Sequence, residues 1–400
     1  MIQSIIVYSL LMFTMILFAV YAARRNGYIS SSGLLVKRSF WRFEVIFPLI
    51  LFAIIFGMRY DVGVDHLGYL HGYLQKIHGG KNEPLFFLFA EIGWKLNWHY
   101  VLYFGVIAFA QALFFFYAFN NERYIYPFLV FFLFTNGEWG FWMNGIRQAL
   151  AMCIWIFSIK YIEDKKLWKY LIWYVVATLI HKSAIVLIVF YPILRNGRDY
   201  FKSIPLQLIL LGSAFVLKSV FEVIFPNIES LINTYINILG ADMYERSYNI
   251  EGLMNSYIEA DGTGLVYLFR IILNVTIILY SKRLKLFYNS KRFNIIYFFF
   301  FIGLLTMYVF PVGFIAITRP FRYFYIFPSI MYAFFLYYLF KTKIKDSQRG
   351  VFHAYFYYGL IFIFLGIFYL SIITSNENSS FWYQFYFDQN IYGYPNRFIN

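Results

Sequence analysis

The chain has 400 residues, of which 61% are hydrophobic and only 14% are charged. Soluble domains have about 45–50% apolar and about 25% charged residues, so this composition excludes an ordinary soluble protein. A net charge of +14 would suggest nucleic-acid binding in a soluble chain. Here the basic residues concentrate in short loops between apolar runs, where membrane topology explains them, and we expect no nucleic-acid partner.

Apolar runs recur along the whole chain. A helix of about 20 apolar residues spans a bilayer, whereas a transmembrane barrel would show shorter alternating strands. The sequence therefore predicts an all-α, polytopic integral membrane protein with about 10–12 transmembrane helices, forming a single domain over 1–400. The candidate spans are 3–22, 40–57, 100–119, 124–137, 146–162, 167–181, 183–194, 204–225, 264–281, 294–312, 324–340 and 351–373.

Two of these runs, 167–181 and 183–194, are short for a full crossing and meet at His181. We expect a broken helix or a half-membrane hairpin near 181–184. Irregular backbone at membrane depth survives only where it lines a cavity or packs inside protein.

Lys and Arg gather in alternate loops, which predicts that these loops are cytoplasmic and that both chain ends lie outside. The first run is then a retained span rather than a secretory signal, because basic residues follow it and none precedes it. The outer face receives a long acidic loop over 226–262, which we expect to form short helices over the outer mouth. The other outer segments are 57–86, 136–147, His181, 313–322 and the tail after 374.

The stretch from 57 to 65 is rich in glycine and carries charge between two apolar helices. Arg59 is either a cation for a ligand or the structural partner of Asp61 and Asp65. Asp65 is the better functional candidate of the two acids, because it lies further from Arg59. Glu83 precedes Pro84, which is suited to open a helix, so Glu83 is either a site residue or the N-cap of that helix.

Two outer segments place arginine where helices are expected to begin. Asn144 is a plausible N-cap just before Arg147, and Pro320 is suited to the first turn between Arg319 and Arg322. The helix macrodipole already makes this end partly positive, so arginine there favours a bound anion such as a phosphate or diphosphate. The alternative is that these arginines reach the lipid headgroups or pair with the acids of the outer stretch.

His181 is either a general base or a residue that holds the break together through backbone carbonyls. The spacing of His66, His71 and His78 does not match a usual zinc site, so no metal is predicted. The single cysteine, Cys153, excludes an internal disulfide. The sequence lacks a serine-nucleophile elbow, a P-loop and a DxD-type motif, which argues against a cytoplasmic sugar-nucleotide enzyme.

Several short motifs occur along the chain in a fixed order. They are Arg-Tyr-x-Val-Gly-x-Asp from Arg59, Glu-Pro-x-Phe from Glu83, Asn-x-x-Arg-Gln-x-x-Ala with Arg147 and Gln148, His-x-Ser-Ala from His181, Arg-x-x-Arg-Tyr from Arg319, and an aromatic tail. This ordered set resembles the EpsG/Wzy-type bacterial polysaccharide polymerases over nearly the whole chain. His66 departs from the family pattern, in which an aromatic residue is commoner after the aspartate.

The resemblance implies a GT-C-like glycosyltransferase at the outer face of the bacterial inner membrane. It would join undecaprenyl-diphosphate-linked oligosaccharide units into O-antigen, capsule or a related surface polysaccharide and release undecaprenyl diphosphate. No cofactor is implied, and the partners would be the lipid-linked substrate, membrane lipids, a chain-length regulator and a flippase. Diphosphate binding would then fall to Arg59, Arg147, Arg319 and Arg322, catalysis to Asp65, His181 and Arg147, with Asp61, Glu83 and Gln148 as further candidates.

Three rival functions remain at this point. A flippase for lipid-linked oligosaccharide would need cations within the spanning cavity and internal repeats, which are not apparent. An O-antigen ligase would share the polymerase chemistry. A membrane O-acetyltransferase would need a polar constellation on the cytoplasmic side. Neither the sugars nor the linkage and its stereochemistry can be predicted.

Overall fold

The structure is a computed structural model. It describes residues 1–25, 27–29, 35–37, 39–77, 83–224, 264–310, 318–343, 348–375 and 381–388. The predicted outer loop over 226–262 and the first half of the segment 313–322, residues 313–317, lie outside these residues.

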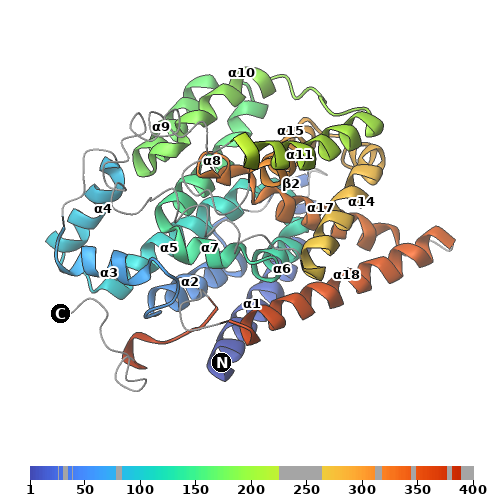
Figure 1. Ribbon diagram of the computed structural model, residues 1–400. Helices are drawn as coiled ribbons and strands as arrows, with labels where there is room; N and C mark the ends of the chain where they lie inside the picture. The colour runs from blue at the N-terminus through green and yellow to red at the C-terminus, as the bar shows by residue number, and fades with distance from the viewer. Residues whose placement is uncertain are drawn as a thin grey trace. The chain divides into compact units, whose positions relative to one another are not determined.

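Every apolar run that was predicted as a span forms helix (Figure 1). The matching helices are α1 (Ile2–Arg24), α2 (Phe43–Gly57), α5 (Tyr100–Ala118), α6 (Tyr126–Thr135), α8 (Ile146–Glu163), α9 (Leu167–Ile180), η2 (Lys182–Val189) with α10 (Phe190–Leu194), α11 (Ile204–Ile224), α14 (Leu265–Tyr288), α15 (Lys291–Val309), α17 (Phe327–Thr342) and α18 (Gln348–Ile373).

Shorter elements connect these helices. They are the helices α3 (His66–Leu74), α4 (Pro84–Lys95) and α7 (Glu138–Asn144) and the 3-10 turns η1 (Asn120–Ile125), η5 (Arg322–Phe324) and η6 (Tyr386–Asp388). Two short strands, β1 (Gly27–Ile29) and β2 (Leu35–Lys37), pair antiparallel, and an isolated antiparallel bridge joins Arg59 and Phe385.

Length and composition identify the membrane-crossing helices. Among the described residues, six helices are long and apolar enough to cross a membrane, and four more are apolar but shorter. The six are Ile2–Arg24, Tyr100–Ala118, Leu265–Tyr288, Lys291–Val309, Arg322–Thr342 and Gln348–Ile373. The protein is therefore an all-α, multi-pass membrane protein, as its composition predicts.

Contacts along the chain group it into two compact units. Unit 1 comprises Met1–Ile159, Ile172–His181 and Tyr332–Asn400, and unit 2 comprises Lys160–Leu171 and Lys182–Met331. The expectation of one integral domain stays a prediction, and each unit is described by itself.

In unit 1, α2 packs closely against α5, and glycines at the contact make this possible. A Cβ atom on Gly57 would collide with the backbone carbonyl oxygen of Val101, and one on Gly105 would lie 3.3 Å from the carbonyl oxygen of Ala53. Helices in a lipid environment associate through such close backbone packing, because no hydrophobic force drives them together. This contact sets the position of the charged stretch that begins where α2 ends.

Three segments of unit 1 that are far apart in sequence meet at one end. The backbone N–H of Tyr383 donates to Ser4 Oγ at 2.9 Å, and its hydroxyl donates to the carbonyl oxygen of Ile55 at 2.7 Å. The N–H of Tyr60 donates to the carbonyl oxygen of Gln384 at 2.9 Å. The predicted alternation of spans puts the N-terminus, the stretch after α2 and the C-terminal tail on one face, and these contacts agree with it.

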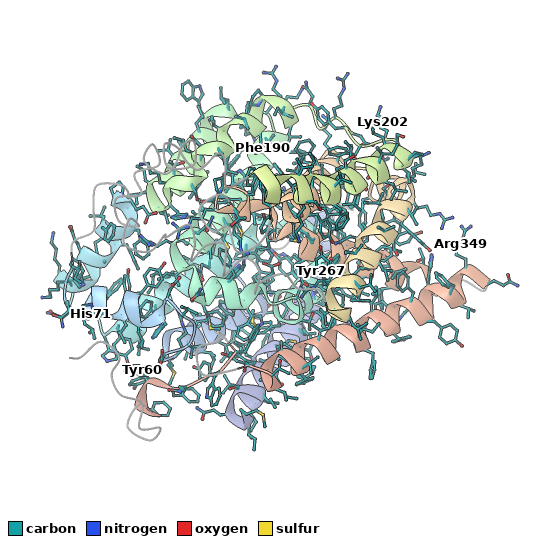
Figure 2. All side chains as sticks on the ribbon, viewed as in Figure 1. Tyr60, His71, Phe190, Lys202, Tyr267 and Arg349 are labelled. Carbon is teal, nitrogen blue, oxygen red and sulfur yellow. The ribbon has the colours of Figure 1, made fainter. Side chains whose placement is uncertain are left out.

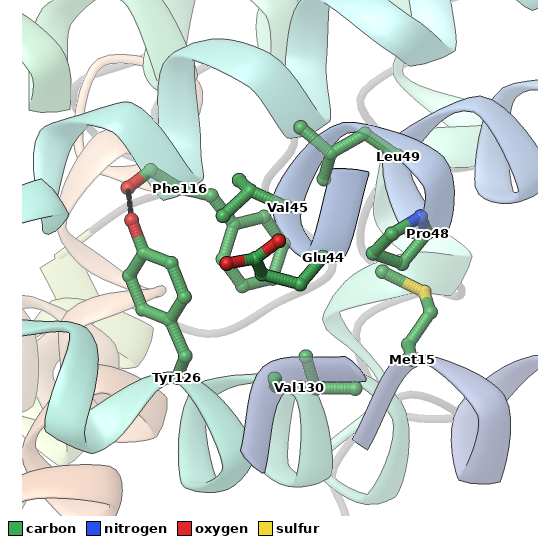
Figure 3. A pocket seen from close by; sticks show the side chains of 9 residues that line it. Met15, Glu44, Val45, Pro48, Leu49, Phe116, Tyr126 and Val130 are labelled. Atoms are coloured by element: carbon green, nitrogen blue, oxygen red, sulfur yellow. Dashed lines mark hydrogen bonds between the residues drawn. The ribbon is translucent and has the colours of Figure 1, made fainter. Parts of the chain in front are cut away.

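A small pocket lies near the start of α2 in unit 1 (Figure 3). Its walls come from α1, α2, α5 and α6, and they are apolar apart from Glu44 and the Tyr126 hydroxyl, which donates to the carbonyl oxygen of Phe116 at 2.6 Å. Glu44 pairs with Arg42 at 3.1 Å. None of the residues predicted for the functional site lines this pocket.

In unit 2, the loop between α10 and α11 is tied to the helices behind it. Lys285 Nζ lies 2.8 Å from Asp199 Oδ1 and 2.5 Å from the carbonyl oxygen of Phe201. Asn294 donates to the carbonyl oxygen of Gly197 at 3.2 Å. These bonds connect the loop to α14 and α15, so the loop is held by charge and backbone contacts rather than by apolar packing alone.

The break predicted near 181–184 is confirmed. Helix α9 ends one residue before His181, and the chain continues as the 3-10 helix η2. In unit 2, the hydroxyl of Tyr170 donates to the carbonyl oxygen of Leu187 at 2.6 Å, and Ser183 Oγ lies 3.2 Å from the hydroxyl of Tyr323. Side chains therefore satisfy polar groups at the break, as irregular backbone in a membrane protein requires.

Replacing Gly57 with alanine is expected to destabilise the protein. The new methyl group would meet backbone atoms of α5 that cannot rotate away, and such overpacking costs about 1–3 kcal/mol. Thermal unfolding in detergent would measure this loss. Gly359→Ala on α18 is the matched control, because a Cβ there meets nothing within 4 Å. Equal stability of the two variants would contradict the close packing of α2 on α5.

Candidate functional site

The candidate site residues of unit 1 meet around one carboxylate, that of Glu83. Its Oε2 lies 2.5 Å from Arg147 NH1, and its Oε1 is hydrogen-bonded to Nδ1 of His181. The side chains of Glu83 and His181 are each 9% exposed, and that of Arg147 is 14% exposed. Three predicted residues from three separate segments therefore form one buried polar cluster, which we call the Glu83 cluster.

The charges of this cluster depend on one another. Burial alone would raise the pKa of the Glu83 carboxyl, but the hydrogen bond from His181 and the charge of Arg147 together lower it below its usual value. Glu83 is therefore ionised at neutral pH although it is mostly buried. A buried charge is tolerated when it is paired and hydrogen-bonded, and here both partners are supplied by other segments of the chain.

The structure tests one of the two roles considered for Glu83, that of helix N-cap. The residue stands at the N-cap position of α4, and Pro84 opens the helix as predicted, but the Glu83 side chain makes no capping hydrogen bond within the described residues. Its two oxygens face Arg147 and His181 instead. The interpretation of Glu83 as a helix cap is therefore wrong for its side chain.

Arg147 lies in the first turn of α8, where the sequence placed it. Its Nε lies 3.4 Å from the hydroxyl of Tyr69, and its guanidinium lies over the rings of Tyr69 at 5.4 Å and Phe86 at 5.8 Å. The aromatic faces attract the cation and hold its plane in one orientation. A guanidinium is a rigid, planar fork of N–H donors, a shape that matches carboxylate and phosphate oxygens.

The start of α8 is positioned by its neighbours. Gln111 of α5 donates to the carbonyl oxygens of Trp142 at 3.3 Å and Ile146 at 3.1 Å, on both sides of the turn between α7 and α8. Asn144 ends α7 and accepts a hydrogen bond from the backbone N–H of Asp65 at 2.8 Å. Asn144 was expected to cap the start of α8, but its side chain binds the stretch after α2 instead.

The other predicted residues of unit 1 lie around this bridge. Asp65 is exposed and stands at the N-cap position of α3. Asp61 is partly exposed and has a left-handed backbone with φ 50°, a conformation that aspartate tolerates better than most residues. Gln148 follows Arg147 and is 8% exposed. Of these, Asp65 has the direct backbone link to the segment that carries Arg147.

Arg59 has a structural role. It is 1% exposed, and its guanidinium donates to the carbonyl oxygens of Phe56 at 2.5 Å and Met143 at 2.9 Å. These carbonyls belong to the last turns of α2 and α7, where helices leave acceptors unsatisfied and favour a cation. Burial lowers its pKa to about 10, so it stays protonated at neutral pH. Arg59 was expected to be a diphosphate ligand or the partner of the two aspartates. Instead, its guanidinium connects the C-terminal ends of α2 and α7.

His66 fills an apolar space beside Arg59. The residue is fully buried, its ring centroid lies 5.2 Å from that of Phe104, and both ring nitrogens lack a hydrogen-bond partner among the described residues. Burial, and then the charge of Arg59, lower its pKa well below the usual value. A neutral, buried imidazole packs here as an aromatic ring would, which explains how a histidine takes this position.

In unit 2, Arg319 lies just before a helical segment, and Arg322 is the first residue of that segment. Arg319 and Pro320 are in a turn, in which the N–H of Phe321 donates to the carbonyl oxygen of Thr318 at 2.9 Å. Arg322 opens η5, and its guanidinium lies 5.7 Å from the ring centre of Tyr325. The prediction that Pro320 lies in the first helical turn is wrong, because the helical segment begins at Arg322.

Two residues that position the cluster were not singled out from the sequence. Tyr69 contacts Arg147, and Gln111 fixes the start of α8. Tyr69 is one of 38 tyrosines, so its type carries no signal. Gln111 lies inside an apolar helix, and a lone amide in a membrane span is the signal that could have identified it.

His66→Phe is expected to fold and to be less sensitive to acid than the natural protein. The folded state holds His66 neutral, whereas the unfolded chain binds a proton below a pH of about 6.5. Stability is therefore retained above that pH and lost as the pH falls below it. Unfolding temperatures of both proteins between pH 7.5 and 5 would show a smaller decline for His66→Phe, and parallel declines would contradict the buried neutral histidine.

The comparison with protein families agrees with the resemblance to EpsG-type proteins. The model of the EpsG family matches residues 42–387, which includes every predicted site residue. No curated protein and no solved structure matches the chain. Because the match covers most of the sequence, the chain belongs to the EpsG family, which is associated with polysaccharide polymerase activity of the glycosyltransferase type.

Proposed function

We propose that this protein polymerises oligosaccharide units carried on undecaprenyl diphosphate at the outer face of the bacterial inner membrane. The growing chain is transferred from its lipid carrier to a sugar hydroxyl of the next lipid-linked unit. The bond between the anomeric carbon and the diphosphate breaks, and undecaprenyl diphosphate leaves. The observation that carries this proposal is the Glu83 cluster, in which an arginine and a histidine share one buried carboxylate.

Arg147 supports the leaving-group chemistry. Negative charge develops on the diphosphate as the glycosidic bond breaks, and fixed donors stabilise that charge in the transition state without reorganising. Arg147 is held by Glu83 and by two aromatic rings, so its orientation is set before substrate arrives. Its position in the first turn of α8 adds the positive end of a helix dipole.

His181 is the stronger candidate for the base that takes the proton from the attacking hydroxyl. Glu83 binds its Nδ1, which favours the tautomer whose Nε2 carries the lone pair. A carboxylate that orients a histidine in this way also stabilises the imidazolium that forms on proton transfer. Asp65, which is exposed and linked to Asn144, is the alternative acceptor.

Arg319 and Arg322 are proposed as further diphosphate ligands. Their support is the sequence pattern and the position of Arg322 at the start of a span-length helix. Arg59 is left out of this set because two helix-end carbonyls occupy its guanidinium.

Arg147→Ala and Arg319→Ala should each abolish polymer while the protein still inserts into the membrane. The test is a gel of surface polysaccharide from a host in which the gene is deleted and restored with each variant. Arg349→Ala is the control, because Arg349 is exposed at the start of α18 (Figure 2). A normal long-chain ladder from both site variants would refute the diphosphate proposal.

The same gel separates the rival functions. Loss of the ladder with single-repeat material still at the surface indicates a polymerase. Loss of single-repeat material as well would favour a flippase or a ligase. An unchanged ladder with altered acetyl content would favour an acetyltransferase.

Removing one charge of the Glu83 cluster should cost more stability than removing two. Glu83→Gln leaves Arg147 buried without its counter-ion, which typically costs about 3–5 kcal/mol, whereas replacing both partners of a buried pair is often neutral. We therefore expect the double variant Glu83→Gln with Arg147→Met to regain stability in thermal unfolding but not polymerisation.

The control for this pair is the exposed ion pair of Lys166 and Asp164, whose atoms lie 2.9 Å apart. Asp164→Asn should change stability by less than about 1 kcal/mol. A double variant that polymerises normally would show that the cluster is structural only.

A further inference from the structure

We propose that an aromatic ledge on unit 1 binds the sugar rings of the polysaccharide during its transfer. The ledge consists of Tyr60, His99, Tyr386 and Phe387, with the carboxylate of Asp61 at its side. This inference rests on the proposed function, since it names the saccharide subsite that a polymerase of this kind needs.

The ledge is rigid because the tail pairs with the stretch after α2. The N–H of Tyr60 donates to the carbonyl oxygen of Gln384 at 2.9 Å, and the N–H of Tyr386 donates to the carbonyl oxygen of Met58 at 2.8 Å. Between these bonds, Arg59 and Phe385 form an antiparallel bridge. Figure 2 shows Tyr60 at the edge of the molecule where this tail runs. The stretch after α2 and the C-terminal tail, which are far apart in sequence, therefore bring their rings together.

The rings are packed against the protein, yet His99 and Phe387 are exposed and Tyr60 and Tyr386 are partly exposed. Tyr386 meets Tyr100 edge-on at 6.3 Å and lies 5.7 Å from the ring of His99. Phe387 stacks on Phe385 at 4.8 Å and is 55% exposed. Tyr60 and Tyr386 also pack against the apolar core that contains Phe86 and Ile146. Rings that are fixed from behind and open in front can stack against the C–H faces of sugars at little entropic cost.

The charge at the ledge favours a sugar over a lipid headgroup. Asp61 is partly exposed and lies directly after Tyr60, and it raises the pKa of the Tyr60 hydroxyl in addition to the larger effect of burial. A carboxylate accepts hydrogen bonds from sugar hydroxyls, whereas it repels a lipid phosphate. The backbone of Asp61 is left-handed, a conformation that most residues avoid and that aspartate tolerates.

Hydrogen bonds connect the stretch that carries the ledge to the segment that carries Arg147 of the Glu83 cluster. Asp61 and Asp65 lie on the same short stretch, and the N–H of Asp65 is bound by Asn144. Asn144 lies three residues before Arg147, and Arg59 binds the carbonyl oxygen of Met143. A sugar chain on the ledge is therefore next to the segment that carries the proposed diphosphate ligand.

The test is saccharide binding to the full-length protein in lipid nanodiscs, measured by saturation-transfer NMR. The probe is the oligosaccharide repeat cut from the host's own surface polysaccharide, which carries no lipid and no diphosphate. Tyr386→Ala and Asp61→Asn should each weaken binding about fivefold to tenfold, as the loss of one ring stack or one hydrogen bond predicts. Tyr386→Phe should retain it, because the ring remains.

The variant Phe387→Ala and the response to anionic lipid allow the proposal to be refuted even if one variant does not fold. Asp61→Asn leaves every ring in place, so it tests the ledge even if Tyr386→Ala fails to fold. Binding unchanged in both Asp61→Asn and the exposed variant Phe387→Ala would overturn the proposal. So would a natural protein that binds no saccharide but responds to the anionic lipid content of the nanodisc, because the ledge would then face headgroups.

The binding assay is independent of turnover. Arg147→Ala should bind the saccharide normally and make no polymer. If Arg147→Ala binds saccharide and also polymerises normally, the proposed role of Arg147 fails while the ledge stands. If deletion of the gene leaves the long-chain ladder unchanged while the protein still binds saccharide, the polymerase proposal fails while the ledge stands. If polymerisation fails as expected in Arg147→Ala but ledge variants bind normally, only the ledge fails.

Discussion

The ionised carboxylate of Glu83 is the constraint on which the rest of the site depends. A buried anion in a membrane protein must be paired, and its two oxygens are met by a guanidinium from α8 and an imidazole at the end of α9. The two partners differ in chemistry. Arginine presents a fixed fork of donors that suits phosphate oxygens, whereas the charge of histidine changes near neutral pH. One acid thereby positions the proposed diphosphate ligand and the proposed base at the same time.

Helix ends supply much of the machinery around this acid. Arg59 satisfies carbonyls at the ends of α2 and α7, Gln111 satisfies those on both sides of the turn before α8, and Asn144 binds the N–H of Asp65. Unsatisfied backbone groups are costly away from water, so a membrane protein that breaks its helices must provide these side chains. The breaks bring charge and irregular backbone to one end of unit 1, and the polar side chains that stabilise them also fix the functional groups.

The C-terminal tail is likewise held by backbone hydrogen bonds to an irregular stretch. It pairs with the stretch after α2 and so completes the end of the unit where the Glu83 cluster lies. The tail carries aromatic rings rather than further charge, and one carboxylate stands beside them. Arginine, histidine and buried acid suit a diphosphate and a proton, whereas rings and an exposed acid suit sugar. The two kinds of surface match the two parts of a lipid-linked oligosaccharide.

The sequence by itself determined the helices and where they break, because burial in lipid imposes long apolar runs and these are visible locally. The start of α8 beside Arg147, the start of α4 at Pro84 and the break at His181 all follow from such patterns. Tertiary structure alone decided that Glu83, which lies 64 residues from Arg147 and 98 from His181, binds both. It also decided that Arg59 joins helix ends and that Asn144 binds Asp65 rather than capping α8. A polar side chain on an irregular stretch has many potential partners of similar energy, and only the packing of distant helices selects among them.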